Sequence, residues 1–279
     1  MDYVKPANVV ENMIDSAASK GRLSIMQMLL RGSLSGALLG IATSLAIGAN
    51  IQSGQPIVGA LVFPVGFVMI CLLGLELVTG SFALLPLGAM AGKINITQVL
   101  KNWVWVFLGN LIGSMAYAAL LSIVLTNNGA TPPNAVGQAI IKIAEAKTNG
   151  YAAYGGDGML TVFVKAMLCN WMVCLGIVMF MVSTNTIGKI VAAWMPIVVF
   201  FAQGFEHAVV NMFVIPAGML MGAHVSISDW WYWNQIPVTA GNIVGGLFLT
   251  GIALFLCHRQ QPTAQITTNL TPIAEEVVL

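Results

Sequence analysis

The residues best suited to chemistry are a glutamate, a histidine and an asparagine that stand together inside an apolar stretch. They are Glu206, His207 and Asn211, in the segment GFEHAVVNM at 204–212. The flanking segments 192–202 and 213–221 carry no charged residue. A histidine can exchange a proton near neutral pH, and its ring nitrogens can donate or accept hydrogen bonds. The pattern therefore favours proton exchange with, or hydrogen bonding to, a ligand in apolar surroundings.

A glutamate beside a histidine could also belong to a metal-dependent intramembrane protease. A zinc-binding helix needs a second histidine four residues after the first, and that position is Asn211. The other histidines, His224 and His258, bring no further set of ligands. We therefore predict no catalytic residue, no metal site and no cofactor. An intramembrane enzyme is kept as the less favoured alternative, and stoichiometric zinc in the purified protein would revive it.

The composition identifies the solvent around these residues. Of the 279 residues, 58% are hydrophobic and 8% are charged, and the mean hydropathy is +0.86. Soluble domains contain about 25% charged residues, so the sequence indicates an integral membrane protein in the lipid bilayer. At membrane depth an ionisable side chain normally faces a cavity or a pathway. A net charge of +1 supplies no basic patch, so we expect no nucleic-acid partner.

Apolar segments recur at lengths that could cross a bilayer. A spanning helix needs about 20 residues, and six segments predict six passages, at about 32–50, 57–77, 103–125, 159–182, 190–205 and 236–257. Two half-length apolar pieces, 82–92 and 213–223, follow polar or glycine-containing breaks, so the second and fifth passages are expected to be interrupted. We predict an amphipathic cytoplasmic helix within 1–31, a pore domain over 32–258 and a disordered cytoplasmic tail over 259–279.

The basic residues predict the orientation of the chain. Cytoplasmic loops of membrane proteins carry an excess of lysine and arginine. If both termini lie inside, the outer segments hold only Lys142, Lys147 and Lys165. The inner segments then hold Lys5, Lys20, Arg22, Arg31, Lys93, Lys101, Lys189 and Arg259. We therefore expect a multi-pass protein of the cell (inner or plasma) membrane with both termini in the cytoplasm.

The sequence contains an internal repeat. GLELVTGSFALLPLGAMAG at 74–92 aligns without a gap on GFEHAVVNMFVIPAGMLMG at 204–222, and GNLIG at 109–113 is echoed by GNIVG at 241–245. Two halves of three helices each must insert in opposite orientations. Inverted repeats of this kind bring broken helices together near the bilayer midplane, where their ends can face a permeant species. The fold class predicted is therefore an all-α membrane bundle with inverted three-helix repeats and two broken helices.

Several segments also carry a family resemblance. GFEHAVVNMFVIPAG, LELVTGS, KNWVWVFLGNLIG, CNWMVCLG and IPVTAGNIVGG resemble, in order, the signatures of the formate/nitrite transporter family. The resemblance implies an aquaporin-like six-helix bundle and a homopentamer with one pore per protomer. It also implies passage of small monovalent anions, formate or nitrite first, with hydrosulfide, bicarbonate or lactate as alternatives.

The resemblance assigns roles to individual residues. It implies a substrate pathway that includes His207, Thr79, Asn170, Leu77 and a vestibule lysine, and constrictions at Phe63, Phe67 and Phe200. The vestibule lysine corresponds best to Lys147. The connection NGYAAYGGDG lengthens the path to the fourth passage, so Lys165 remains a competing candidate.

The charged and amide residues beside His207 are expected to support the helix breaks. A carboxylate that faced an anion would repel it, so Glu76 and Glu206 are interpreted as acceptors for backbone N–H groups. Asn211 could satisfy loop backbone or the imidazole. The function expected is transport of a small anion, with proton coupling through His207. A water or neutral-solute pore shares the architecture but explains neither His207 nor the outer lysine.

Overall fold

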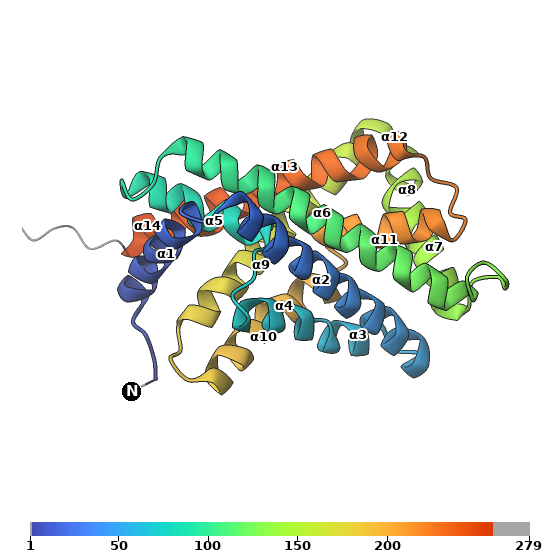
Figure 1. The fold of residues 1–279 in the computed structure, drawn as a ribbon, viewed down its shortest axis with the longest axis horizontal. Coiled ribbons are helices and arrows are strands. Elements are labelled where there is room, and N and C mark those ends of the chain that lie inside the picture. The colour runs from blue at the N-terminus through green and yellow to red at the C-terminus, as the bar shows by residue number, and fades with distance from the viewer. Residues whose placement is uncertain (1, 259–279) are drawn as a thin grey trace, which may run out of the picture.

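The computed structural model describes residues 2–258 as a bundle of helices (Figure 1). Four stretches of helix are long and apolar enough to cross a membrane. Within the described range these spans are α2 (Ile25–Ser53), α6 (Ile96–Thr126), α9 (Gly155–Met181) and a continuous run from Ile227 to His258. The last run consists of α12 (Ile227–Trp230), η1 (Trp231–Gln235), α13 (Ile236–Val244), η2 (Gly245–Ile252) and α14 (Ala253–His258), where η denotes a π-helical turn.

The two remaining passages are broken, as the sequence predicts. Each consists of shorter apolar helices, with an extended link before the last helix. The first broken passage contains α3 (Pro56–Val62), α4 (Pro64–Leu72) and α5 (Val78–Met90), and the second contains α10 (Thr186–Ala202) and α11 (Ala208–Leu220). Leu77 and His207 are the residues that precede α5 and α11, and both have extended backbone angles. The prediction of six passages with the second and fifth interrupted is confirmed.

The repeat is visible in the backbone as well as in the sequence. Gly74 and Gly204 end the first half of each broken passage with φ angles of 61° and 62°. The next residue in each half donates its N–H back to a helical carbonyl, from Leu75 to Ile70 at 3.0 Å and from Phe205 to Phe200 at 3.2 Å. Glycine adopts a positive φ without a steric penalty, which explains why both breaks begin with this residue.

The repeat also includes two short helices that lie outside the aligned segments 74–92 and 204–222. These are α1 (Pro6–Gly21), which packs on α5, and α7 (Ala135–Lys147), which packs on α11. A Cβ placed on Gly88 would lie 2.6 Å from the Cβ of Ala17, and one on Gly218 would lie 2.5 Å from that of Ala144. The motif Ala-x-x-Lys occurs at 17–20 and again at 144–147. The two helices are therefore equivalent members of the two halves.

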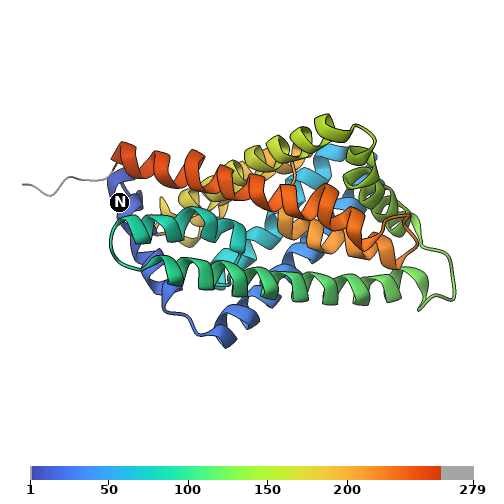
Figure 2. The ribbon, with the colours of Figure 1, turned by 90° about the horizontal axis from the view of Figure 1, so that it is seen from above.

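The ends of the bundle reflect this symmetry. Helices α1 and α14 lie together at one end, and α7 and the short α8 (Asn149–Ala152) lie at the other (Figures 1 and 2). Helix α2 begins at Ile25, earlier than the expected position 32, because Ser24 caps it: the Gln27 N–H donates to the Ser24 hydroxyl at 3.2 Å. The tail predicted over 259–279 lies outside the described residues.

Small residues allow α2 and α6 to pack closely. A Cβ on Gly32, Gly36, Gly109 or Gly113 would press against backbone atoms of the opposite helix, because no side chain separates the two backbones there. Apolar burial drives helix association weakly in lipid, so close van der Waals packing between small residues takes its place. This pair fixes α6, whose Asn110 reaches the first helix break.

We predict opposite effects of adding one methyl group at two glycines of these helices. Gly113→Ala should lower stability by about 1–3 kcal/mol through overpacking, since its Cβ would collide with the Ser33 carbonyl. Gly48→Ala, where nothing lies within 4 Å, should leave stability unchanged or raise it by up to about 1 kcal/mol. Thermal unfolding of the purified proteins in one detergent measures both, and equal melting temperatures would contradict the packing described.

Candidate functional site

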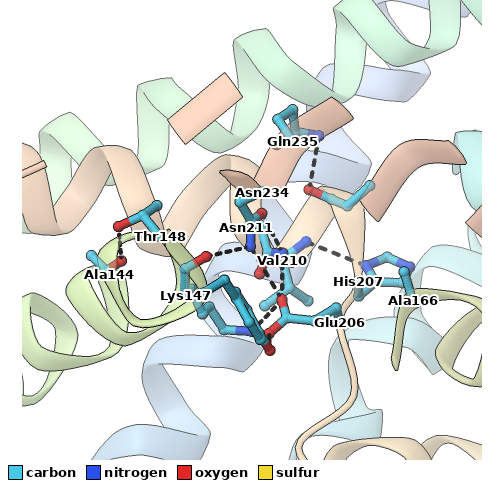
Figure 3. Close-up of polar contacts among 12 residues, drawn as sticks. Ala144, Lys147, Thr148, Ala166, Glu206, His207, Val210, Asn211, Asn234 and Gln235 are labelled. Carbon is cyan, nitrogen blue, oxygen red and sulfur yellow. Dashed lines mark hydrogen bonds and ion pairs between the residues drawn. The ribbon is translucent and has the colours of Figure 1, made fainter. Parts of the chain in front are cut away.

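The two helix breaks meet at a buried pair of polar side chains. His207 Nε2 lies 3.0 Å from Thr79 Oγ1, and the two residues are 2% and 0% exposed. His207 Nδ1 accepts the Val210 N–H at 3.3 Å (Figure 3). Because Nδ1 is occupied as an acceptor, a neutral ring carries its proton on Nε2 and donates it to Thr79. The Thr79 hydroxyl hydrogen is then free to be donated to a ligand.

Both members of the pair stand at a helix N-terminus. His207 directly precedes α11 and Thr79 lies in the first turn of α5. Backbone N–H groups at a helix start have no partner within the helix, and the helix dipole makes this end positive. Two such ends that meet at one point favour a negatively charged ligand.

An asparagine from α6 holds the first break together. The Oδ1 atom of Asn110 accepts the Val78 N–H at 3.0 Å. Its Nδ2 atom donates to the carbonyl oxygens of Gly32 and Glu76, both at 2.9 Å. One side chain thus satisfies an N–H and a carbonyl of the break, which have no helical partner, and ties them to a carbonyl of α2.

An asparagine from α13 does the same at the second break. The Oδ1 atom of Asn242 accepts the Ala208 N–H at 2.9 Å, and its Nδ2 atom donates to Ala166 at 2.7 Å and to Glu206 at 3.0 Å. The sequence reveals this pair only as the repeated Gly-Asn of GNLIG and GNIVG, to which the sequence analysis gives no role. The structure makes both asparagines clamps on the breaks.

The two glutamates bind lysines rather than backbone N–H groups. Glu76 accepts Lys20 Nζ on both carboxylate oxygens at 2.8 Å. Glu206 accepts Lys147 Nζ at 2.7 Å and Asn211 Nδ2 at 2.8 Å. The lysines come from the repeat-related helices α1 and α7, so each half contains one ion pair beside its break. Both carboxylates are therefore compensated before any ligand arrives.

Two residues that the sequence analysis did not single out form further hydrogen bonds around the Lys147–Glu206 ion pair. The Tyr151 hydroxyl, from α8, donates to Glu206 at 2.8 Å. Burial, and then the Glu206 carboxylate, raises the pKa of Tyr151, so its phenol remains a donor. Asn234, in η1, accepts from Asn211 and donates to the Lys147 carbonyl, both at 2.8 Å (Figure 3). For Tyr151 the available sequence signal was the lengthened connection NGYAAYGGDG, which does not indicate a contact.

The three candidate constriction residues are all buried, but they fall into two groups. Phe63 and Phe200 meet edge to face with centroids 5.6 Å apart, and Phe63 also stacks on Phe201 at 4.1 Å. Phe200 stacks on the His207 ring at 5.9 Å. Phe67 instead borders the cavity on the Lys20 side. Phe201 was not anticipated, although it directly follows Phe200 in the sequence.

Cavities approach the central pair from both ends of the bundle. The Lys20 vestibule, of about 300 Å³, is bordered by Lys20, Arg31, Phe67, Glu76 and Leu77 among others. The Lys147 vestibule, of about 610 Å³, is bordered by Lys147, Tyr151, Asp157, Lys165 and Glu206. A third cavity of about 180 Å³ joins Lys147 to Phe200 and His207.

Not every expected pathway residue borders these cavities. Asn170 lies behind the central pair, where its Nδ2 atom donates to the carbonyls of Thr79 at 3.0 Å and Asn242 at 2.6 Å. Asn211 contacts Glu206 and Asn234 rather than His207. Leu77, in contrast, borders the Lys20 vestibule. Between residues 2 and 258 no three His, Cys, Asp or Glu side chains are grouped to hold a metal.

Inverted repeats with two broken helices, and cavities that lead to a buried polar pair, define the class of multi-pass membrane channels and transporters. The formate/nitrite transporter family model matches residues 7–256. The chain belongs to this family, whose members are channels and transporters and not enzymes.

Individual relatives agree with this assignment. The chain is 34% identical over 261 residues to a probable formate transporter of Methanothermobacter thermautotrophicus, covering 88% of this chain and 93% of that protein. It is 32% identical over 267 residues to the formate channel BtFdhC of Bacillus thuringiensis, covering 94% and 98%. A solved FNT family ion channel superposes with a TM-score of 0.78 at 26% identity, covering 90% of this chain and 98% of that one. The aquaporin-like fold predicted is thus confirmed.

We predict that the two asparagine clamps are required for folding. Replacing Asn110 or Asn242 by leucine leaves two buried backbone groups of a break, one N–H and one carbonyl, without partners, and each costs about 1–3 kcal/mol. Either variant should lose most of its correctly assembled protein in size-exclusion chromatography. Gln138→Leu, which removes one long hydrogen bond at an exposed site, is the matched control. Normal assembly of both clamp variants would contradict the role assigned here.

Proposed function

We propose that this protein is a membrane pore for small monovalent anions, with formate as the principal substrate. The observation that carries the proposal is the buried His207–Thr79 pair between the two vestibules, since it presents a hydroxyl donor at two helix N-termini. Two of its relatives are named a formate channel and a probable formate transporter, which supports formate as the principal substrate. Nitrite, hydrosulfide, bicarbonate and lactate are the alternatives of the same class.

The proposed pathway runs from one vestibule to the other. An anion enters beside Lys147, passes Phe200, Phe201 and the neighbouring Phe63, and reaches Thr79 and His207. It then leaves past Leu77 and Phe67 into the Lys20 vestibule. Apolar constrictions exclude solutes that cannot give up their water. Sulfate and phosphate, which are larger and more strongly hydrated than formate, are therefore rejected.

Proton coupling through His207 is the finer part of the proposal. In the neutral ring, Nε2 donates to Thr79 while Nδ1 accepts from Val210. Transfer of a net proton to the anion would require a second proton on the ring, at Nδ1, where it would displace the Val210 N–H. The doubly protonated ring is therefore a transient state that the arriving anion stabilises, and protons are the second partner of transport.

The proposed assembly is a homopentamer in the cell membrane. A solved structure that shares this fold is described as a pentameric formate channel with formate bound, and it superposes with a TM-score of 0.66 at 24% identity over 84% of this chain and 97% of that one. The excess of basic residues on the α1 side supports a cytoplasmic position for both termini. The Lys20 vestibule then faces the cytoplasm, and the Lys147 vestibule faces outward.

Substitutions of His207 test the proposed function in proteoliposomes. His207→Phe should abolish proton-coupled formate flux, because it removes the imidazole beside Thr79, which can exchange a proton near neutral pH. His207→Asn keeps a hydrogen-bond donor without a titratable ring, and should retain passive formate conduction while losing its pH dependence. Formate and nitrite fluxes are measured across imposed pH gradients after the oligomer size has been checked. Wild-type flux and pH profile in His207→Phe would contradict the mechanism.

Phe200→Ala tests the constriction. Removing this ring should admit bulkier monocarboxylates, so the ratio of lactate to formate flux should rise by about tenfold if the aromatic contact contributes about 1.4 kcal/mol of selectivity. Phe248→Ala is the matched control, because Phe248 is 53% exposed on the outside of the chain. A lower melting temperature with an unchanged flux ratio would show that the ring only packs.

A further inference from the structure

Each vestibule contains a second cation besides the lysine bound to glutamate. Arg31 borders the Lys20 vestibule and Lys165 borders the Lys147 vestibule. Both side chains are half-buried. Neither lies within 4 Å of a carboxylate in the part of the chain that the structure describes, where the ion pairs are Lys20–Glu76 and Lys147–Glu206.

The lysines bound to glutamate contribute little net field. Lys20 lies 2.8 Å from Glu76, and Lys147 lies 2.7 Å from Glu206. Opposite charges this close act on a distant anion as a dipole, whose potential falls off faster than that of a single charge. The attraction felt by an anion that approaches either vestibule therefore depends on the second cation.

The two second cations occupy equivalent positions in the repeat. Asn110 donates to the Gly32 carbonyl and Asn242 donates to the Ala166 carbonyl, so Gly32 and Ala166 correspond across the two halves. Arg31 and Lys165 each precede the corresponding residue. The same geometry that clamps each break thus places a cation one residue before the clamped carbonyl. Alignment of sequence segments 74–92 and 204–222 does not include this correspondence.

Lys165 also has a defined place within its vestibule. Its Nζ lies 5.8 Å from the centre of the Tyr151 ring, and the Tyr151 hydroxyl is held by Glu206. The aromatic face favours the ammonium without neutralising it. The Lys165 carbonyl accepts the Glu206 N–H at 3.4 Å, which ties its backbone to the break.

We propose that Arg31 and Lys165 are the residues that capture small monovalent anions, one in each vestibule, before the anion passes to the His207–Thr79 pair. The proposal rests on the proposed anion-pore function and adds the two entry sites to it. The paired lysines Lys20 and Lys147 then hold the helix breaks in place. In the sequence analysis Lys147 and Lys165 are alternative candidates for the vestibule lysine. In this proposal each has a role of its own.

One acidic residue opposes Lys165. Asp157 borders the same vestibule and is exposed in the first turn of α9, eight residues before Lys165 and so about 12 Å away along the helix. It lies nearer the mouth and repels an approaching anion. Removing the Asp157 charge should therefore strengthen anion capture, whereas removing the Lys165 charge should weaken it.

The test is one-sided formate conductance of the full-length protein in planar bilayers. At roughly 10 mM ionic strength, where screening is weak, Lys165→Gln should raise the half-saturating formate concentration about threefold from its own side, and Arg31→Gln should do so from the other side. Asp157→Asn should lower this concentration on the Lys165 side. Lys142→Gln and Lys101→Gln, which remove exposed lysines outside the vestibules, should change neither value.

Raising sodium gluconate to roughly 1 M should remove the differences among the variants, because the screening length falls to about 3 Å. Lys165→Arg should restore the wild-type value. Wild-type half-saturation in both glutamine variants, or a wild-type value that does not respond to salt, would overturn the proposal. If the capture proposal fails but the wild-type protein still conducts formate, the proposed function stands. If the wild-type protein conducts no formate, the proposed function itself is refuted.

Discussion

The structure depends on one constraint: two stretches of non-helical backbone lie inside the membrane, and the protein itself must satisfy their hydrogen bonds. Asn110 and Asn242 each bind an N–H and a carbonyl at one of these breaks and a third carbonyl on α2 or α9. They can reach the breaks only because α6 packs backbone to backbone on α2 through glycines, and because α13 and η2 pack on α9 in the same way at Gly241 and Gly245. Close helix packing is therefore a condition for the pore and not only a source of stability.

The central site is an asymmetric pair on a symmetric frame. Leu77 and His207 occupy equivalent positions before α5 and α11, with nearly the same backbone angles. Only one of them carries a polar side chain, and its partner Thr79 comes from the other half. The frame brings the two helix starts together, and His207 from one half forms a single hydrogen bond with Thr79 from the other.

Much of this architecture could be predicted from the sequence, because it depends on local signals. Glycine at 74 and 204, the apolar lengths and the matching segments predict two broken helices, and the intramembrane cost of an ionisable group identifies His207. The roles of Tyr151, Asn234 and the two asparagine clamps could not be predicted in the same way. Their partners lie on other helices, and periodicity within one helix carries no information about such contacts. The equivalence of α1 and α7 rests on two residues of four, too few to stand out in the sequence alone.

The tautomer of His207 at neutral pH tests the central claim most directly. The account requires a neutral ring with its proton on Nε2, because Nδ1 accepts the Val210 N–H. Nitrogen-15 NMR of the histidine-labelled protein in lipid separates the two neutral tautomers and the doubly protonated ring, and a His207→Asn spectrum assigns the signal among the three histidines. We expect an unprotonated Nδ1 and a protonated Nε2 at His207. A proton on Nδ1 at rest, in either the other tautomer or the cation, would contradict the account.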